Sequence, residues 1–496
     1  MLKMPDIDKK VLSRRGDIVA ALAGMLPSDS LIWHETEMRV FQSDGLSAYR
    51  QMPMVVVLPK TTEQVANVLR YCHQNSIRVV PRGAGTSLSG GALPLADAVV
   101  VGMTKFNRIL EIDYDNRCVV AQPGVTNLAI SDAVGERSFY YAPDPSSQIA
   151  CTIGGNVAEN SGGVHCLKYG LTTNNVLGVE LVLINGEVLR LGGKHLDAEA
   201  YDLLGLLVGS EGLLGIVTEV TVRILRRPET ARAMLLGFAS SRAAGDCVGA
   251  IIAQGIIPAG MEMMDRPAIH AAEAFVRAGY PLDVEALLIV EIDGPGVEVD
   301  ALLSRVLEIA ENHGAVHSRA SASEEERALL WAGRKAAFPA VGRISPDYYC
   351  VDGTIPRAQL SHVLEQMAGL SKKYGLGLAN VFHAGDGNLH PLILYDANKA
   401  DELEKAERFG ADILKLCVKV GGVLTGEHGV GVEKRDLMPV MFSEAELNQQ
   451  QRVKCAFDAR SLLNPGKMFP TLHRCAELGR MHIHRGQVPF PDIPRF

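Results

Sequence analysis

Short apolar runs alternate with helical patterns in the first half of the chain. Residues 55–58 are continuously apolar, and Thr61 or Thr62 caps a following stretch whose valines and leucine share one helical face. A second apolar run, residues 77–80, then enters a glycine-rich loop. This order of strand, helix and strand predicts a sheet covered by helices.

The alternation continues toward the C-terminus. It predicts further strands within residues 97–102, 108–124, 177–191, 214–225, 231–240 and 286–294, and helices near 241–254, 297–313 and 399–420. The pair Asn185-Gly186 is a hairpin signal inside one of these strand regions. Glycine density falls beyond Pro228, which predicts a domain boundary near residue 228.

These patterns predict four segments. Residues 1–50 form a polar helical arm, residues 51–228 a glycine-rich domain, and residues 229–470 a second domain. Residues 471–496 carry three prolines and no periodicity, which predicts either a disordered tail or a docking strap.

Composition narrows the class of protein. The chain has 496 residues, of which 47% are hydrophobic and 21% charged, as in a soluble globular protein with two or three domains. Its net charge of −8 argues against nucleic acid as a partner. The nine cysteines include no CxxC pair and no iron–sulfur spacing, which favours a reduced, cytoplasmic compartment.

The hydropathy pattern predicts no membrane span. The N-terminal residues lack the apolar core of a signal peptide, and no apolar run reaches about 18 residues. Glu211 interrupts the best candidate. Docking at a membrane through partner proteins is compatible with this pattern.

The segment HAGDGNLH, residues 383–390, places two histidines on either side of a turn. Asp386-Gly387 predicts a two-residue hairpin loop, which would set His383 directly opposite His390. Imidazoles whose Cβ atoms lie about 5 Å apart can share one metal ion. Two solvated histidines that pair across the hairpin are the alternative.

A second motif, GEHGVG at residues 426–431, favours a metal site over two solvated histidines. Neighbouring side chains on extended chain point in opposite directions, so Glu427 can join the histidines while His428 faces a substrate. Two histidines and one carboxylate form a catalytic metal set that suits zinc, manganese, iron or cobalt. A chance Glu-His pair would leave the hairpin unexplained.

Three glycine-rich loops next to predicted strands favour a large phosphate-bearing cofactor. They span residues 79–94, 144–170 and 208–220. Backbone N–H groups of such loops can surround a diphosphate, because glycine lets the ligand approach closely. The spacing does not match the dinucleotide fingerprint GxGxxG. A zinc hydrolase built on the same histidines would leave these loops unexplained.

In combination these segments resemble a known flavoprotein family. The loop at 81–94, TIGGNVAENSGG and GSEGLLGIVTEV are similar to the FAD-binding domain of the vanillyl-alcohol oxidase superfamily. HAGDGNLH, GEHGVG and LLNPGKMFP resemble the C-terminal domain of its D-2-hydroxyacid dehydrogenase branch. The resemblance implies an α+β fold: a two-part FAD-binding domain over residues 51–228, and a cap domain, residues 229–470, with an antiparallel sheet covered by helices.

The resemblance also implies residues that contact FAD. They are Arg82, Gly83, Ala84, Gly85, Thr86, Ser89 and Gly90; Pro145; Thr152, Gly154, Gly155, Asn160, Gly162, Gly163, Tyr169 and Gly170; Glu211, Gly215, Ile216 and Val217; and Asn464. Thr86 stands where relatives with covalent flavin carry histidine, so non-covalent FAD is implied.

The cap domain would hold the chemistry. The resemblance implies His383, His390 and Glu427 as ligands of a divalent metal, and His428 as base. Arg334 matches the arginine that binds the substrate carboxylate. Arg343 is a second candidate, and a solvated helix face is the alternative for both arginines. Phe338 and Pro391-Leu392 stand where relatives acting on longer diacids place polar groups, which implies a small substrate.

The implied reaction is oxidation of a small 2-hydroxy acid to its 2-oxo acid. The glycolate-oxidising members fit best, with glyoxylate as product; D-lactate or D-2-hydroxyglutarate is the alternative substrate. A noncatalytic FAD-binding scaffold is the alternative from another class. The resemblance further implies a complex with a second FAD-domain subunit and an iron–sulfur subunit, peripheral at the inner membrane, that passes electrons to quinone.

Overall fold

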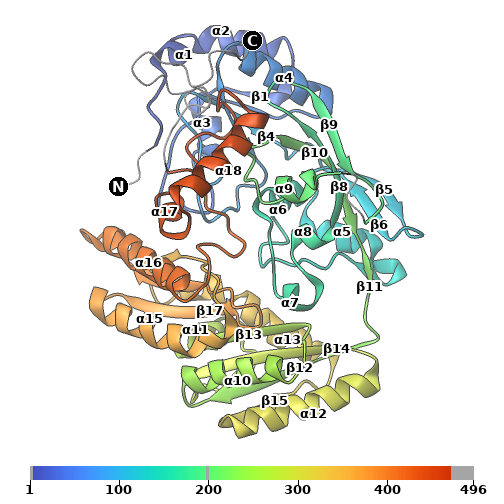
Figure 1. The fold of residues 1–496 in the computed structure, drawn as a ribbon, viewed down its shortest axis with the longest axis vertical. Coiled ribbons are helices and arrows are strands. Elements are labelled where there is room, and N and C mark those ends of the chain that lie inside the picture. The colour runs from blue at the N-terminus through green and yellow to red at the C-terminus, as the bar shows by residue number, and fades with distance from the viewer. Residues whose placement is uncertain (1–3, 197–199, 471–496) are drawn as a thin grey trace, which may run out of the picture.

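The computed structural model describes residues 4–196 and 200–470, which form two parts (Figure 1). The upper part in Figure 1 holds the glycine-rich first half of the chain, and the lower part holds a larger sheet with long helices. The predicted docking tail, residues 471–496, lies outside the described residues.

The first sheet of the upper part is mostly parallel. In spatial order its strands are β1 (Leu31–Ile32), β2 (Val55–Val57), β4 (Ala98–Gly102) and β3 (Arg78–Arg82). Helix α4 (Thr62–Gln74) joins β2 to β3, and the Thr61 side chain caps it by accepting from the Gln64 N–H, as predicted. Short helices α1 (Lys9–Ser13) and α2 (Arg15–Ala23) precede this sheet, and α3 (Glu35–Met38) lies between β1 and β2 in the chain.

Helix α2 belongs to the core of that sheet. Ile18 and Leu22 are fully buried, and they pack in one cluster with Val55 and Leu69. The N-terminal segment therefore contributes buried side chains to the core beneath the first sheet.

The second sheet is antiparallel. Its order is β5 (Ile109–Asp113), β6 (Cys118–Ala121), β10 (Ile216–Arg223), β8 (Val176–Val182) and β9 (Val188–Gly192). Val182 pairs with Val188, and Gly186 between them has φ +85°, so the predicted Asn185-Gly186 hairpin is confirmed. The short helices around this sheet are α5 (Asn127–Val134), α6 (Ile153–Glu159), α7 (Cys166–Tyr169), α8 (Thr172–Asn175) and α9 (Leu203–Leu207).

The lower part is one seven-stranded antiparallel sheet between two layers of helices. Its order is β15 (Ala315–Ala320), β12 (Thr230–Phe238), β14 (Ala286–Gly294), β13 (Gly260–Asp265), β17 (Gly377–His383), β18 (Pro391–Tyr395) and β16 (Asp347–Cys350). Helices α10 (Ser241–Ala253), α12 (Gly296–Asn312), α15 (Leu360–Tyr374) and α16 (Glu402–Lys419) cover one face. Helices α11 (Arg266–Val276), α13 (Glu324–Lys335) and α14 (Ala337–Val341) cover the other. The helices predicted near 241–254, 297–313 and 399–420 are confirmed.

The alternation of side chains along each strand determines which residues face the layer of α11, α13 and α14. In β13, Met261 and Met263 pack under α10 and α12, so Glu262 between them points to the α11 and α13 side. The same alternation in β17 turns His383 to that face, and the register pairs His383 with Glu262.

The chain finally returns to the upper part. Helix α18 (Glu444–Phe457) lies beside the upper part in Figure 1, and Lys454 Nζ donates to the Leu213 carbonyl at 2.6 Å. Leu463 is fully buried and bridges to Val79 of β3. Because of this return, the glycine-rich loop 421–431 runs between the two parts.

Candidate active site

A cavity of about 710 Å³ lies between the two parts. The loop after β3, helix α6 and the segment before β10 supply its upper walls. His390, Glu427 and His428 line its lower end. The cavity therefore joins the glycine-rich loops to the motifs singled out in the second half of the chain.

Most of the residues predicted to hold FAD line this cavity. They are Arg82, Gly83, Ala84, Gly85, Thr86, Pro145, Thr152, Gly154, Gly155, Glu211, Gly215, Ile216 and Val217. At two of these positions a neighbouring residue lies so close to the backbone that only glycine fits. A Cβ on Gly83 would lie 2.6 Å from Thr152 Oγ1, and one on Gly154 would lie 2.4 Å from Pro123 Cβ.

The other predicted FAD residues, Ser89, Gly90, Asn160, Gly162, Gly163, Tyr169, Gly170 and Asn464, do not line the cavity. Several of them brace its walls instead. Asn464 donates to the carbonyls of Gly91 and Glu211, and Ser89 Oγ donates to the His428 carbonyl at 2.8 Å. Tyr169 donates to Asp293 of β14, across the two parts. Gly162 N–H donates to Glu427 Oε2 at 2.9 Å.

The histidine hairpin differs from the predicted one. Strands β17 and β18 pair in a register that sets His383 opposite Asn388, not opposite His390, and the loop has four residues, 384–387. Gly387 alone takes positive φ, +78°, and its N–H bonds the His383 carbonyl. The two-residue loop was wrong because only one of its two positions adopts the left-handed backbone.

The two rings nevertheless meet. In the observed register His390 is the diagonal neighbour of His383 on the same face, a separation that long side chains span. Their ring centroids lie 5.0 Å apart. His383 Nε2 lies 3.2 Å and His390 Nε2 3.3 Å from the same oxygen, Glu427 Oε1.

These three side chains are buried and electrostatically coupled. Burial alone would raise the pKa of Glu427, but its contacts with His383 and His390 hold that pKa well below its usual range. Burial would likewise lower the pKa of His383, yet Glu262, 2.7 Å from His383 Nδ1, raises it well above its usual value. Burial lowers the pKa of His390.

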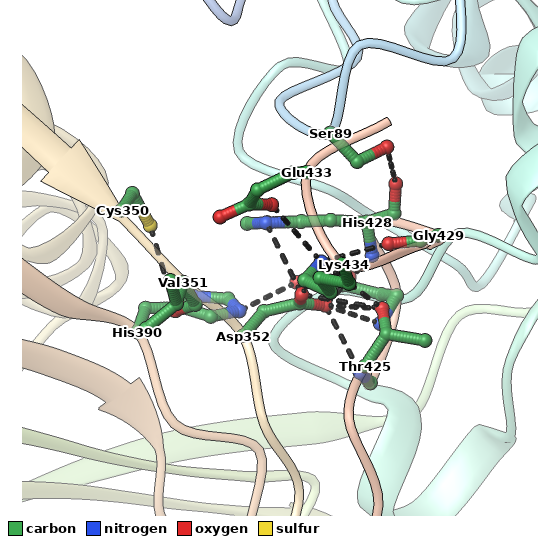
Figure 2. Close-up of polar contacts among 12 residues, drawn as sticks. Ser89, Cys350, Val351, Asp352, His390, Thr425, His428, Gly429, Glu433 and Lys434 are labelled. Carbon is green, nitrogen blue, oxygen red and sulfur yellow. Dashed lines mark hydrogen bonds and ion pairs between the residues drawn. The ribbon is translucent and has the colours of Figure 1, made fainter. Parts of the chain in front are cut away.

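A second carboxylate, Asp352, shapes the loop that carries Glu427 and His428. One oxygen, Asp352 Oδ2, accepts the backbone N–H groups of Gly426, Glu427 and His428 at 3.0, 2.9 and 2.8 Å (Figure 2). The fully buried Lys434 donates to the other oxygen. Although burial acts against it, the pKa of Asp352 is held at about 2 by His428 and Lys434. The carboxylate is thus a charged anchor for the turn.

His428 stacks on His390 at the end of the cavity. The ring centroids are 4.8 Å apart, and His428 Nδ1 lies 3.7 Å from Asp352 Oδ1. Burial lowers the pKa of His428 to about 4, so the ring is neutral near pH 7. A neutral imidazole with a carboxylate behind it can accept a proton, and the carboxylate stabilises the resulting charge.

The two candidate arginines lie in different places. Arg334 is 1% exposed, and its Nη2 pairs with Glu262 Oε2 at 2.5 Å. Its Nε and Nη1 have no hydrogen-bond partner among the described residues. Arg343 is exposed and donates to the Ala274 carbonyl at the end of α11, so the fold does not bring it to the site.

Two residues of the site escaped the sequence analysis. Glu262 connects Arg334 to His383, and Asp352 holds the 426–428 turn. A signal was present for each, because each is a lone acid within an apolar stretch, MEMM for Glu262 and YYCVDG for Asp352. A lone buried acid requires a partner, which is a reason to place it in a polar site.

The residues present fit a divalent cation. One ligand atom from each of His383, His390 and Glu427 can be chosen so that all lie within 4.8 Å of one another, and all three side chains are buried. Glu262 on His383 is the outer carboxylate that orients a ligating imidazole. His390 Nε2 has no hydrogen-bond partner among the described residues, as expected of a ligand.

The cavity likewise fits an extended cofactor with a diphosphate. Its upper walls are glycine-rich backbone next to Arg82, and its lower end meets the imidazoles. Among the residues that the structure describes, no helix is long and apolar enough to cross a membrane.

Two family descriptions match the chain. Residues 53–192 match "FAD binding domain", and residues 227–468 match "FAD linked oxidases, C-terminal domain". Together they include the glycine-rich loop after β3, helix α6 and the imidazole–carboxylate cluster.

Curated relatives cover nearly the whole chain. The chain is 54% identical over 493 residues to glycolate oxidase subunit GlcD of Escherichia coli K12, covering 99% of this chain and 98% of that one. It is 39% identical to the Bacillus subtilis subunit of the same name, covering 87% and 92%. It is 32% identical to a D-lactate dehydrogenase of Archaeoglobus fulgidus, covering 84% and 92%.

A solved structure confirms the fold prediction. The structure of p-cresol methylhydroxylase superposes with a TM-score of 0.78, covering 94% of this chain and 98% of that one, at 16% identity. The predicted architecture, a two-part FAD-binding domain of the vanillyl-alcohol oxidase type with a cap on an antiparallel sheet, is the observed one.

Proposed function

The chain belongs to the family of FAD-linked oxidases that act on hydroxy acids, and from this premise we propose that it oxidises glycolate to glyoxylate at the cluster of His383, His390 and Glu427. Its similarity to two glycolate oxidase subunits supports glycolate as the substrate. One observation carries the proposal: this cluster lies at the end of the cavity, where His390 and Glu427 line it and Glu262 joins His383 to Arg334. The Nε and Nη1 atoms of Arg334 have no hydrogen-bond partner among the described residues.

Arg334 binds the substrate carboxylate in this proposal. Its Nε and Nη1 are buried without partners, and a guanidinium offers a carboxylate two parallel hydrogen bonds. Glu262 takes the remaining nitrogen and fixes the plane of the guanidinium. A divalent cation held by His383, His390 and Glu427 would supply Lewis acidity toward the hydroxyl oxygen.

His428 takes the hydroxyl proton. Burial keeps its imidazole neutral, and Asp352 lies close enough to Nδ1 to stabilise the charge after transfer. The carbon atom next to the carboxylate loses a hydride, and the hydroxyl loses a proton, which leaves the carbonyl of the 2-oxo acid. The bound flavin would supply the acceptor of that hydride. His390 stacks on His428 and thereby fixes the direction in which the base points.

FAD is held non-covalently in this proposal. Thr86 lines the cavity at the place where covalent relatives carry histidine. Arg82 donates to the Ser43 carbonyl through Nη1 and leaves other nitrogens toward the cavity that it lines. The metal is zinc, manganese, iron or cobalt, because two imidazoles and a carboxylate suit each of them.

The electrons leave through partner proteins. The similar Escherichia coli protein is named a subunit, which supports a complex of several chains. We place a second FAD-domain subunit and an iron–sulfur subunit in that complex, with membrane quinone as the final acceptor. Such a complex would dock peripherally at the inner membrane, and nothing in the composition favours nucleic acid as a partner.

D-lactate is the second candidate substrate. The similarity to a D-lactate dehydrogenase supports it, and lactate differs from glycolate by one methyl group. A noncatalytic scaffold role is disfavoured, because a scaffold has no need of a buried cluster of two imidazoles and a carboxylate.

Anaerobic titration of the purified, flavin-loaded protein tests the proposal. Glycolate is expected to bleach the flavin absorbance stoichiometrically, and D-2-hydroxyglutarate to bleach it at least tenfold more slowly. The His428→Asn variant is expected to bind flavin and to resist reduction. Rapid bleaching of that variant by glycolate would refute the base assignment, and a wild-type protein that no 2-hydroxy acid reduces would refute the function.

A further inference from the structure

An aromatic side chain stands beside the metal ligands in the cavity wall. Phe338 of α14 lines the cavity together with His390 and His428. Its ring meets the His390 ring edge-on, with centroids 5.9 Å apart and planes at 76°. Phe338 therefore bounds the space next to the cluster on one side.

Phe338 also meets a second ring behind it. The Tyr348 ring of β16 lies 6.3 Å from the Phe338 ring at 78°, again edge-on. Both side chains are half-buried.

A second cavity, of about 180 Å³, lies behind this pair. Tyr348 lines it and Phe338 does not, whereas Phe338 lines the first cavity and Tyr348 does not. Gly45 and Leu88 line both, so the two spaces adjoin. The Phe338–Tyr348 contact thus joins a residue that lines the space at the cluster to one that lines the second cavity, and we call this pair of rings the partition.

The chemistry of the second cavity limits what it can hold. Its lining combines polar groups with apolar side chains, and among the described residues no lysine or arginine lines it. The polar groups come from Ser47, Asp347, Tyr348, Tyr349 and Tyr395, and the apolar side chains from Leu46, Ala48, Leu88 and Pro346. An apolar or hydroxyl-bearing tail fits such a space, whereas a second carboxylate would face Asp347 without a cation.

We propose that the Phe338–Tyr348 pair sets the upper limit on the length of the group attached to the carbinol carbon, and that the second cavity would accept the tail of a longer acid if the pair were opened. The proposal rests on the proposed function, because it assumes a 2-hydroxy acid clamped between Arg334 and the cluster. With both ends of the acid fixed, its remaining substituent has to extend toward a wall of the cavity. Phe338 is a specificity-determining residue in that arrangement, and Tyr348 is its support.

The test compares Phe338→Ala with wild type on glycolate, D-lactate and D-2-hydroxyvalerate, each in the flavin-loaded full chain. One methylene in an apolar pocket changes selectivity by about 10–200-fold. The ratio of kcat/KM for D-2-hydroxyvalerate over glycolate is expected to rise at least tenfold. D-2-hydroxyglutarate, which carries a second carboxylate, is expected to gain less than threefold. Phe275→Ala, which removes an exposed ring far from the cavity, is the matched control and should leave both ratios unchanged.

Tyr348→Ala removes the other ring of the pair, on the side of the second cavity. It provides a second test if Phe338→Ala does not fold. Calorimetric binding of 2-oxovalerate and glyoxylate gives the same comparison without turnover. A ratio that stays within twofold of wild type in both folded variants, by kinetics and by calorimetry, would overturn the proposal. If the wild type oxidises no 2-hydroxy acid, the proposed function fails, and the calorimetric ratio still decides whether the partition limits length.

Discussion

The upper wall of the cavity is mainly glycine-rich backbone, whereas the lower wall is formed by imidazole and carboxylate side chains. Above, the chain approaches itself so closely that Gly83 and Gly154 have no room for a Cβ atom, and backbone forms the surface. Below, His390 and Glu427 line the cavity, and they are held by contacts among buried ionisable groups that include His383 and Asp352. The shape of the upper wall requires glycine, which has no Cβ atom. The lower wall requires ionisable side chains that stabilise one another while buried.

This difference predicts opposite sensitivities. A larger side chain should damage the upper wall even when its chemistry is neutral, because backbone cannot move aside cheaply. A substitution of equal size should damage the lower wall when it removes one charge, because the partner charge is then left buried. Variants of the two walls should therefore fail in different ways.

The largest effect is expected for Glu427→Gln. The change keeps the size of the side chain and removes the charge that meets both imidazoles. Turnover of glycolate should fall about a thousandfold, while the ratio of flavin to protein stays at the wild-type value. Steady-state kinetics and flavin absorbance measure the two quantities. Glu404→Gln on the surface of α16 is the matched control. Loss of flavin together with turnover would show that the two walls are not independent.

Gly154→Val should produce the reverse pattern. A Cβ at this position would lie 2.4 Å from Pro123 Cβ, so the wall has to move. FAD affinity should fall about a hundredfold, roughly 3 kcal/mol, without removal of any charge. Fluorescence titration of the flavin-free protein measures it. Gly249→Ala, where nothing lies within 4 Å of the added Cβ, is the control. Unchanged FAD affinity in Gly154→Val would contradict the role assigned to the upper wall.

The next effect concerns the two arginines. Arg334→Lys keeps the charge but loses the planar fork, so kcat/KM for glycolate should fall about 10–100-fold, mostly through KM. Arg343→Lys should change it less than twofold, because Arg343 contacts the Ala274 carbonyl on the surface. Equal effects of the two substitutions would remove Arg334 from its proposed position at the substrate carboxylate.

The smallest effect is expected at a charged contact between the two parts. His165 lies between Asp144 and Glu291, at 3.0 and 3.1 Å. Burial would lower the pKa of His165, but these two carboxylates raise it to about 10. A raised pKa means that the folded protein binds more protons than the unfolded chain between about pH 6.5 and 10. The stability from this contact is complete below that window and is lost as the pH rises through it.

His165→Gln tests that pH dependence. The substitution should lower the free energy of unfolding by about 2 kcal/mol at pH 7 and by much less at pH 10. Thermal unfolding followed by circular dichroism at both values measures the difference, with the exposed His362→Gln as control. An equal loss at pH 7 and pH 10 would contradict the charged state assigned to His165.

The sequence predicted elements whose signals are local. The cap on α4, the Asn185-Gly186 hairpin and helices α10, α12 and α16 follow from capping, turn and periodicity rules that need only neighbouring residues. The burial of α2 was not predicted, because Ile18 and Leu22 acquire their partners, such as Val55, only when the first sheet folds.

For the site, the sequence predicted which residues lie together but not the strand register that brings them there. The three predicted ligands lie together, but the expected reason was wrong, since the register makes His383 and His390 diagonal neighbours rather than opposed ones. The register is fixed along the whole length of β17 and β18, from Gly377 opposite Leu394 to Asn380 opposite Pro391, and the residues of the turn alone do not determine it. Glu262 and Asp352 were missed, because each acts through partners that lie about 75–120 residues away in the chain.

Metal analysis of the flavin-loaded protein, before and after treatment with a chelator, decides whether the cluster holds a catalytic ion. One divalent ion per chain is expected in the wild type and none in Glu427→Gln. Chelation should abolish glycolate oxidation and leave the flavin spectrum intact, and the returned ion should restore turnover. Full turnover in chelated protein with no bound ion would contradict the claim that His383, His390 and Glu427 hold a catalytic metal.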